Sequence, residues 1–294
     1  MIVITGAKGQ LGQSFRQLAA LWPKQAFVFL DTQDLDISDQ KAVRAFFNSL
    51  VQEKSPVWVV NCAAYTAVDK AESEPEKAKK INVLGVKNLA EACAQRGFPL
   101  LHFSTDYVYH NRQNTPFRET DPVSPKGVYA RTKLAGERAA FRAHPALTMV
   151  IRTSWVYSPH GHNFVKTMLR LGRERTHLSV VSDQIGSPTY APDLAAAVLQ
   201  IIQQIESGKL PMASIAGVWH YANEGVASWY DFAASIFELG NIPCQLRPIA
   251  TEEYPTPARR PPFSVLDKSK IKAAFELEIS HWRESLKACL EALG

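Results

Sequence analysis

Short runs of β-branched and aromatic residues alternate with longer segments of helical periodicity through the first half of the chain. Such alternation is typical of βαβ units, in which consecutive strands pair in parallel and the connecting helices cover the sheet. We therefore expect an α/β fold with a doubly wound parallel sheet. The predicted strands are residues 2–5, 27–30, 57–60, 100–104 and 148–153.

The helices between these strands are bounded by capping and stop signals. Ser38 is expected to N-cap the second helix, because its hydroxyl can accept a hydrogen bond from a free backbone amide. Gly97 is expected to end the third, because glycine readily adopts the left-handed conformation that closes many helices. The predicted helices are residues 11–19, 38–50, 75–95 and 129–142.

The second half of the chain is less regular. Of the 18 prolines, 6 lie between residues 243 and 262, so we expect an extended loop there. Ser228 is expected to cap the helix that follows it. The predicted helices are residues 164–175, 194–205, 229–239 and 281–293, and the predicted strands are 178–181 and 218–221.

The composition excludes several classes of protein. With 46% hydrophobic and 21% charged residues, the chain can bury a core and is not of the disordered type. Its 33 basic residues against 28 acidic ones are dispersed, so we expect no nucleic-acid partner. No apolar run of about 18 residues occurs, so we expect no membrane span. The 4 cysteines have no paired spacing and no secretion signal is evident, which favours a cytoplasmic location.

Three glycines follow the first predicted strand at intervals of three: Gly6, Gly9 and Gly12, with Gln10 and Leu11 between the last two. A glycine turn lets the backbone approach a pyrophosphate, whose charge is stabilised by the free amides and the dipole of the following helix. An ordinary strand-to-helix turn is the alternative. The position in the first βαβ unit favours a dinucleotide site.

Two further strand ends fit such a site. Asp31 directly follows the second predicted strand, where an acid usually accepts hydrogen bonds from the adenosine ribose. Asp31 favours NADH, but Lys8 could pair with a phosphate, so NADH and NADPH both stay open. The segment after the third strand, Asn61 to Thr66, has small side chains that a cofactor could lie against, although tight packing explains them equally well.

Tyr129 and Lys133 are spaced to lie one turn apart on one helix face. We expect the Lys133 ammonium to lower the pKa of the Tyr129 phenol from about 10 toward neutrality. The phenol could then give a proton to a carbonyl oxygen as hydride reaches the carbon. This pair occurs by chance in many helices, but Ser104 and Thr105 at the end of the fourth strand add hydroxyls that could bind the same carbonyl.

These motifs divide the chain into two expected parts. Residues 1–155 are expected to form a dinucleotide-binding domain, to which about 190–225 return, and 156–294 a substrate-binding lobe. The ligand should lie at the carboxyl ends of the strands, where the two parts meet.

The chain resembles the extended short-chain dehydrogenase/reductase family over nearly its whole length. The resemblance implies a Rossmann-like doubly wound parallel sheet with a smaller C-terminal lobe that binds a sugar nucleotide. The segments that carry it are GAKGQLG, NCAAYTAVDKAESEPE, STDYVY, VYARTKLAGE, RTSWVY, NFVKTMLRL, DQIGSPT, SWYDFA and YPTPARRP.

The resemblance also implies roles for individual residues. Tyr129 would be the proton donor, Lys133 would orient the nicotinamide ribose, and Thr105 would tune the donor. Arg260 could clamp a diphosphate, although a solvated basic side chain is the simpler explanation of that residue. The implied cofactor contacts are Gly9 to Gly12, Asp36, Ile37, Ala64, Tyr65, Thr66, Tyr129 and Lys133, and the implied substrate contacts are Thr105, Asp106, Trp155, Asn163 and Arg260.

The implied reaction is the reduction of dTDP-4-dehydro-β-L-rhamnose to dTDP-β-L-rhamnose by NADPH or NADH, the last step in making this sugar nucleotide. Reduction of another 4-keto sugar nucleotide and a non-catalytic regulatory subunit of the same fold are the alternatives. The resemblance also implies Mg²⁺ held by glutamates at a homodimer contact. Ser14 occupies one position where such an acid is expected, and Pro192 and Asp193 stand where a second is expected, so no metal ligand is assigned.

Overall fold

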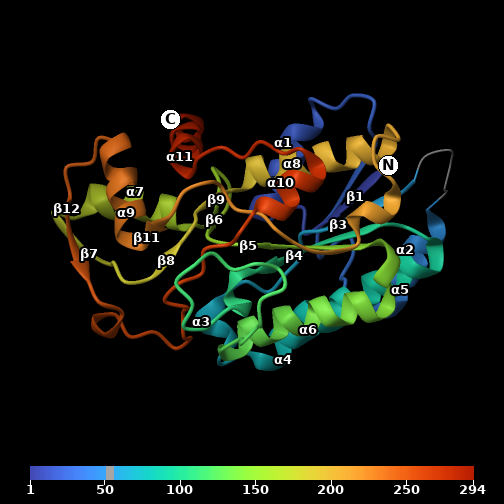
Figure 1. The fold of residues 1–294 in the computed structure, drawn as a ribbon, viewed down its shortest axis with the longest axis horizontal. Helices are drawn as coiled ribbons and strands as arrows, with labels where there is room; N and C mark the ends of the chain where they lie inside the picture. Colours follow the sequence, from blue (N-terminus) through green and yellow to red (C-terminus); the bar gives the residue numbers. More distant parts are fainter. Residues whose placement is uncertain (51–55) are drawn as a thin grey trace.

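In the computed structural model, which describes residues 1–50 and 56–294, a six-stranded sheet runs through the larger part of the molecule (Figure 1). Its order is β10-β5-β4-β3-β1-β2, and all neighbours are parallel. The expected doubly wound parallel sheet is confirmed, and chain order reverses between β1 and β3, where such sheets bind ligands. The strands are β1 (Ile2–Thr5), β2 (Phe27–Leu30), β3 (Trp58–Asn61), β4 (Leu100–Thr105), β5 (Thr148–Thr153) and β10 (Gly217–His220).

Helices cover both faces of this sheet (Figure 1). Along β1, Val3 packs with residues of α2 and α5, whereas Ile2 and Ile4 pack with Phe15 of α1 and the apolar face of α8. Side chains of a strand alternate between faces, so one continuous apolar run supplies both cores. The helices concerned are α1 (Gln10–Ala19), α2 (Gln40–Ser49), α5 (Val86–Arg96), α6 (Gly127–Ala143), α8 (Ala191–Glu206) and α10 (Ser269–Phe275).

A second core lies toward the other end of the molecule. It is built around Phe232 and Trp282, which meet edge to face with ring centroids 5.7 Å apart. Its elements are α7 (Phe164–Glu174), α9 (Trp229–Leu239), α11 (Trp282–Leu293), and the strands β6 (Val156–Tyr157), β7 (His177–Val181), β8 (Ile185–Gly186), β9 (Thr189–Tyr190), β11 (Ala227–Ser228) and β12 (Gln245–Ile249). Within the described residues, no helix is both long and apolar enough to cross a membrane.

The cap of α2 differs from the prediction. Asp39, not Ser38, is the N-cap, and its carboxylate accepts hydrogen bonds from the amides of Lys41 and Ala42 at 2.9 and 3.1 Å. The Ser38 hydroxyl donates instead to Asp36, 2.6 Å away. At the start of α9, Ser228 and Asp231 form a capping box, so the predicted Ser228 cap is confirmed.

The predicted helix over 75–95 is interrupted. It comprises α4 (Pro75–Lys79), a π-helical turn over Lys80–Gly85, and α5. Inside that turn the buried Asn82 side chain accepts from the Tyr65 amide at 2.8 Å and donates to the Tyr65 carbonyl at 3.1 Å. A Cβ on Gly136 of α6 would collide with the Asn82 carbonyl, so tertiary packing accompanies the irregular turn. Gly97 ends α5 with φ +66°, as predicted.

The proline-rich segment is not entirely a loop. Residues Gln245–Ile249 form β12, which pairs in parallel with β7. Pro248 is tolerated because β12 has a neighbour on one side only in this two-stranded sheet. The prediction of an extended loop was wrong for these residues, and helix α10 was not predicted.

Candidate active site

The glycine turn after β1 has the close backbone packing that a dinucleotide site needs. Gly6 has φ +67°, and a Cβ there would lie 2.6 Å from the Ala63 amide nitrogen. A Cβ on Gly12 would collide with the Gly6 carbonyl. Gly9 is the N-cap of α1 and supplies no side chain, so the first amides of the helix are free for an anion. The turn therefore fits a pyrophosphate.

A cleft of about 600 Å³ lies at the carboxyl ends of β1, β3, β4 and β5. The glycine turn, the start of α6 and the segment after β5 all contribute to its walls. The structure brings together in this cleft most of the predicted site residues: Gly9, Gln10, Leu11, Ala64, Thr66, Thr105, Asp106, Tyr129, Lys133, Trp155 and Asn163. The other predicted residues, Gly6, Gly12, Asp31, Asp36, Ile37, Tyr65 and Arg260, are not among those that line it.

Tyr129 and Lys133 both face this cleft from α6, but their electrostatic relationship differs from the expectation. The Lys133 ammonium donates to the Phe103 carbonyl at 2.6 Å. Burial lowers the pKa of Lys133 to about 8, although Glu137 opposes the shift. Burial raises the pKa of Tyr129 to about 12, opposed by its hydrogen bond with Thr105 and reinforced by the charge of Asp106. The expected lowering of the Tyr129 pKa toward neutrality is thus absent here, because burial dominates and the Lys133 ammonium is hydrogen bonded to the strand backbone.

Thr105 and Asp106 form a buried pair where β4 ends. The Thr105 hydroxyl lies 3.1 Å from Asp106 Oδ1 and accepts a hydrogen bond from the Tyr107 amide at 3.2 Å. Burial raises the pKa of Asp106 to about 7, while the Ser264 and Thr105 hydroxyls lower it. A carboxyl with such a pKa changes its charge near neutral pH.

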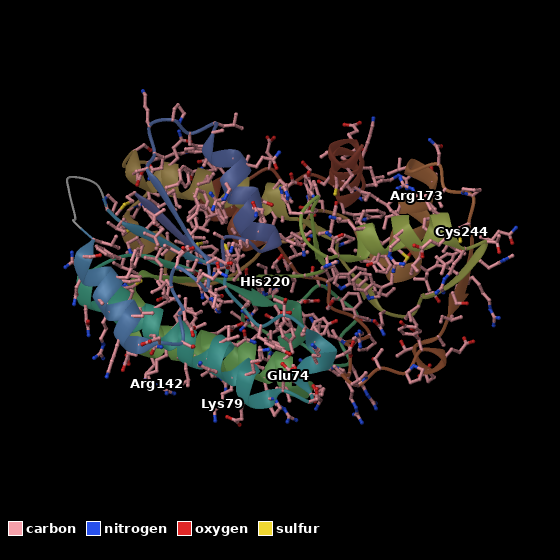
Figure 2. All side chains as sticks on the ribbon, turned by 180° about the vertical axis from the view of Figure 1, so that it is seen from behind. Glu74, Lys79, Arg142, Arg173, His220 and Cys244 are labelled. Carbon is pink, nitrogen blue, oxygen red and sulfur yellow. The ribbon has the colours of Figure 1, made fainter. Side chains whose placement is uncertain are left out.

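Ser104 lines the cleft, but its hydroxyl has a partner inside the protein. Its hydroxyl donates to Glu137 of α6, whose carboxylate also receives two hydrogen bonds from Arg152 of β5 at 2.7 and 3.0 Å. Arg152 in turn donates to the Tyr109 hydroxyl at 2.6 Å, and that hydroxyl lies 2.9 Å from Nε2 of His220, a residue of the interior (Figure 2). Sequence reasoning missed this network. The sequence signal that could have revealed it is the presence of two opposite charges, Glu137 and Arg152, in a helix and a strand that are expected to be buried.

At the expected adenosine end, the acids are engaged by neighbouring side chains. Asp31 pairs with Lys8 at 3.3 Å, and Asp36 accepts hydrogen bonds from Ser38. Ile37 is buried in the core, where a Cβ on Gly85 would press on it. The Tyr65 hydroxyl turns away to Glu74, 2.9 Å distant.

On the expected substrate side, two of the predicted residues have structural partners. The Trp155 ring stacks on Trp229 with centroids 3.6 Å apart. Asn163 caps α7, and its amide donates to Gln10 Oε1 at 2.9 Å, which joins the second core to the glycine turn.

Arg260 makes a two-point ion pair with Asp69, at 2.7 and 3.1 Å. It lines a neighbouring cavity of about 460 Å³ rather than the main cleft. Tyr107 and Trp229 line both cavities, so the second lies directly beyond the first.

The implied magnesium ion finds no suitable donor set. Across residues 1–50 and 56–294, no group of three or more His, Cys, Asp or Glu side chains is placed to hold a metal. The buried Ser14 hydroxyl donates to the Gln10 carbonyl, and Asp193 already accepts hydrogen bonds from Asn223 and Ser285. These positions do not fit a magnesium site.

The doubly wound sheet, the glycine turn and the Tyr129–Lys133 pair in one cleft define an extended short-chain dehydrogenase/reductase. A family model described as "RmlD substrate binding domain" matches residues 1–294, and the chain belongs to this family.

Several relatives can be aligned with this chain over almost its whole length. A dTDP-4-dehydrorhamnose reductase of Aggregatibacter actinomycetemcomitans is 41% identical over 293 residues, covering 97% of each chain. One of Escherichia coli is 39% identical, covering 99% of this chain and 97% of its own. The crystal structure of one from Clostridium acetobutylicum is 42% identical with a TM-score of 0.89, covering 99% of both chains. One from Bacillus anthracis in complex with NADP is 34% identical with a TM-score of 0.90, covering 99% of this chain and 98% of its own.

Proposed function

We propose that this chain reduces the 4-keto group of dTDP-4-dehydro-β-L-rhamnose to give dTDP-β-L-rhamnose, using NADPH or NADH. One observation carries the proposal: Thr105, Tyr129 and Lys133 line the same cleft as the glycine turn. The relatives named dTDP-4-dehydrorhamnose reductase support the substrate, and the relative in complex with NADP supports the cofactor.

The chain's own groups would hold the cofactor along the strand ends. The amides after Gly9 would bind its pyrophosphate, and Ala64 and Thr66 leave room at the end of β3 for the rest of the molecule. Asp31 would accept from the adenosine ribose, and its partner Lys8 is the cation available to a 2′-phosphate. Both forms of the cofactor are therefore to be tested.

The reaction needs a hydride and a proton. When bound, the reduced nicotinamide supplies the hydride to the carbonyl carbon. Tyr129 gives its phenolic proton to the carbonyl oxygen, and a proton donor in this position contributes on the order of 10² to 10⁴ in rate. Thr105 stabilises the phenolate that remains, because its hydrogen bond lowers the pKa of Tyr129. Lys133 places a cation in the same cleft when protonated.

In this proposal the substrate occupies both cavities. Its sugar would lie beside Tyr129 and Thr105, and its diphosphate and base would extend past Tyr107 and Trp229 toward Arg260. On this basis we divide the chain into a cofactor part, 1–155 with 190–225 returning to it, and a substrate lobe over the rest of 156–294. The four free cysteines are consistent with the cytoplasmic location that we propose.

Turnover across several sugar nucleotides tests the proposal. NADPH and NADH oxidation would be followed with dTDP-4-dehydrorhamnose and with other 4-keto sugar nucleotides. We expect the highest kcat/KM with dTDP-4-dehydrorhamnose. A higher value with another sugar nucleotide would reassign the substrate, and no oxidation with any of them would contradict the reductase activity. Light scattering of the same preparation tests the homodimer that the resemblance implies.

A further inference from the structure

Asp106 is a buried carboxyl group beside the proton donor. It is 1% exposed, lines the cleft, and has one oxygen, Oδ1, 3.1 Å from the Thr105 hydroxyl. Its other oxygen, Oδ2, is buried and has no partner at full hydrogen-bond geometry among the described residues, although the Ser264 hydroxyl is close enough to lower the pKa of the carboxyl. No cation within the described ranges forms an ion pair with it. A buried carboxylate without a compensating charge is costly, which favours the protonated form.

The Thr105 hydroxyl is close to two oxygens. Asp106 Oδ1 lies 3.1 Å from it, and the Tyr129 phenol is near enough for Thr105 to lower its pKa by hydrogen bonding. A hydroxyl has a single proton to donate, although it can accept from more than one donor. Thr105 can therefore donate to Asp106 or to Tyr129, but not to both at once.

We propose that the proton on Asp106 sets the direction of the Thr105 hydroxyl and so decides whether Tyr129 can give its proton to the substrate. This inference rests on the reduction proposed above. Asp106 acts through Thr105 and is a positioning residue for the reaction.

The two protonation states of Asp106 produce opposite hydrogen-bond directions. Protonated Asp106 donates to Thr105, Thr105 donates to the Tyr129 oxygen, and the Tyr129 proton points to the carbonyl. Ionised Asp106 accepts from Thr105, so Thr105 can only accept from Tyr129. The phenolic proton is then directed away from the substrate.

The surrounding charges favour the same assignment. The charge of ionised Asp106 raises the pKa of Tyr129, so it opposes loss of the phenolic proton. Burial places the pKa of Asp106 at about 7, and the donating chain is therefore present below that pH and lost above it. Besides Asp106 and Tyr129, the titratable groups that line the cleft are Cys62 after β3, Tyr107, Lys133 on α6 and His162 before α7. Tyr107 is flanked by Arg260 and Asp69.

The Asp106→Asn variant separates this role from simple packing. An asparagine amide always carries a proton to donate to Thr105 and cannot ionise. In the wild type, kcat/KM should fall with a midpoint near pH 7, where Asp106 ionises. In the variant, whatever its maximal rate, the midpoint should move up by about one pH unit, to the range where Lys133 titrates.

Glu119→Gln is the matched control. Glu119 is also a carboxyl whose pKa is raised by burial, but it accepts from the His220 amide at 3.0 Å, outside the cleft. Its amide variant should keep the wild-type midpoint. A midpoint for Asp106→Asn that coincides with the wild type, or an equal shift in Glu119→Gln, would overturn the proposal. So would a folded Asp106→Asn protein that is inactive at every pH.

A measurement without substrate keeps the test independent of catalysis and of the folding of Asp106→Asn. In protein labelled with [4-¹³C]aspartate, one carboxyl resonance should titrate near pH 7. Thr105→Val should raise that midpoint, because the Thr105 hydrogen bond lowers the pKa of Asp106. Ordinary midpoints for every aspartate would refute the inference. If the wild type oxidised NADPH with none of the 4-keto sugar nucleotides tested, the proposed function would be refuted instead. The carboxyl resonance would still report the protonation of Asp106 in that case.

Discussion

Glu137 and Arg152 form a buried two-point ion pair, at 2.7 and 3.0 Å, that joins the helix bearing Tyr129 and Lys133 to strand β5. Both side chains are at most 5% exposed. Glu137 lies one turn after Lys133, so the pair fixes the face of α6 that is turned to the cleft. The orientation of the reactive helix thus depends on two residues that do not themselves line the cleft.

Replacing one partner of this pair should be costly. Glu137→Gln would leave the Arg152 guanidinium buried without its counter-charge, and we expect a loss of about 3–5 kcal/mol in the free energy of unfolding. Urea unfolding measures this loss. The control is Glu174→Gln, which removes the exposed pair with Arg170 and should cost less than about 1 kcal/mol. Equal losses in both variants would show that the buried pair contributes no more to the free energy of unfolding than the exposed pair does.

Lys133 should lower the free energy of unfolding at neutral pH, because its charge is buried. Burial lowers its pKa from 10.5 to about 8, so between these values the unfolded chain holds more protons than the folded one. The free energy of unfolding should therefore rise with pH through this window, with the full cost of burying the charge present below it. Lys133→Met removes that cost, and we expect a gain on the order of 1–3 kcal/mol at about pH 7 that shrinks by about pH 9.5.

Lys79→Met is the control for this gain. Lys79 is an exposed lysine at the outer surface of the helical layer (Figure 2). Its replacement should change stability by less than about 0.5 kcal/mol. The account of Lys133 would be wrong if Lys133→Met were less stable than the wild type at neutral pH, or if its gain did not depend on pH.

Activity should not depend on magnesium. The positions that the resemblance suggested for metal ligands hold Ser14 and an Asp193 that is already hydrogen bonded. We expect the same turnover after dialysis against a chelator and after addition of Mg²⁺. A loss of activity with the chelator that Mg²⁺ restores would point to a donor set that a single copy of the chain does not assemble.

The sequence predicts the parallel sheet well because its signals are local. Continuous apolar runs such as Val57–Val60 indicate strands covered on both faces. Gly6 lies in a turn where a side chain of any size would collide with the neighbouring backbone. Tyr129 and Lys133 share a face by helix geometry alone. Each of these predictions depends on residues close together in the chain.

The features that the sequence did not predict depend on distant partners. The Arg260–Asp69 pair joins residues 191 positions apart. The sequence around Arg260 therefore does not indicate that its guanidinium is bound by a carboxylate. Lys133 was expected to act on Tyr129, but the carbonyl of Phe103 on a different element binds it instead. The π-helical turn around Asn82 likewise accompanies contacts with Tyr65 and Gly136.

The most direct test of the central claim compares the wild type with Tyr129→Phe. Cofactor affinity would be measured by fluorescence titration and turnover by NADPH oxidation with dTDP-4-dehydrorhamnose. We expect Tyr129→Phe to bind the cofactor as the wild type does and to lose at least about 100-fold in turnover, because only the donated proton is removed. Turnover equal to that of the wild type would contradict the assignment of Tyr129 as the proton donor.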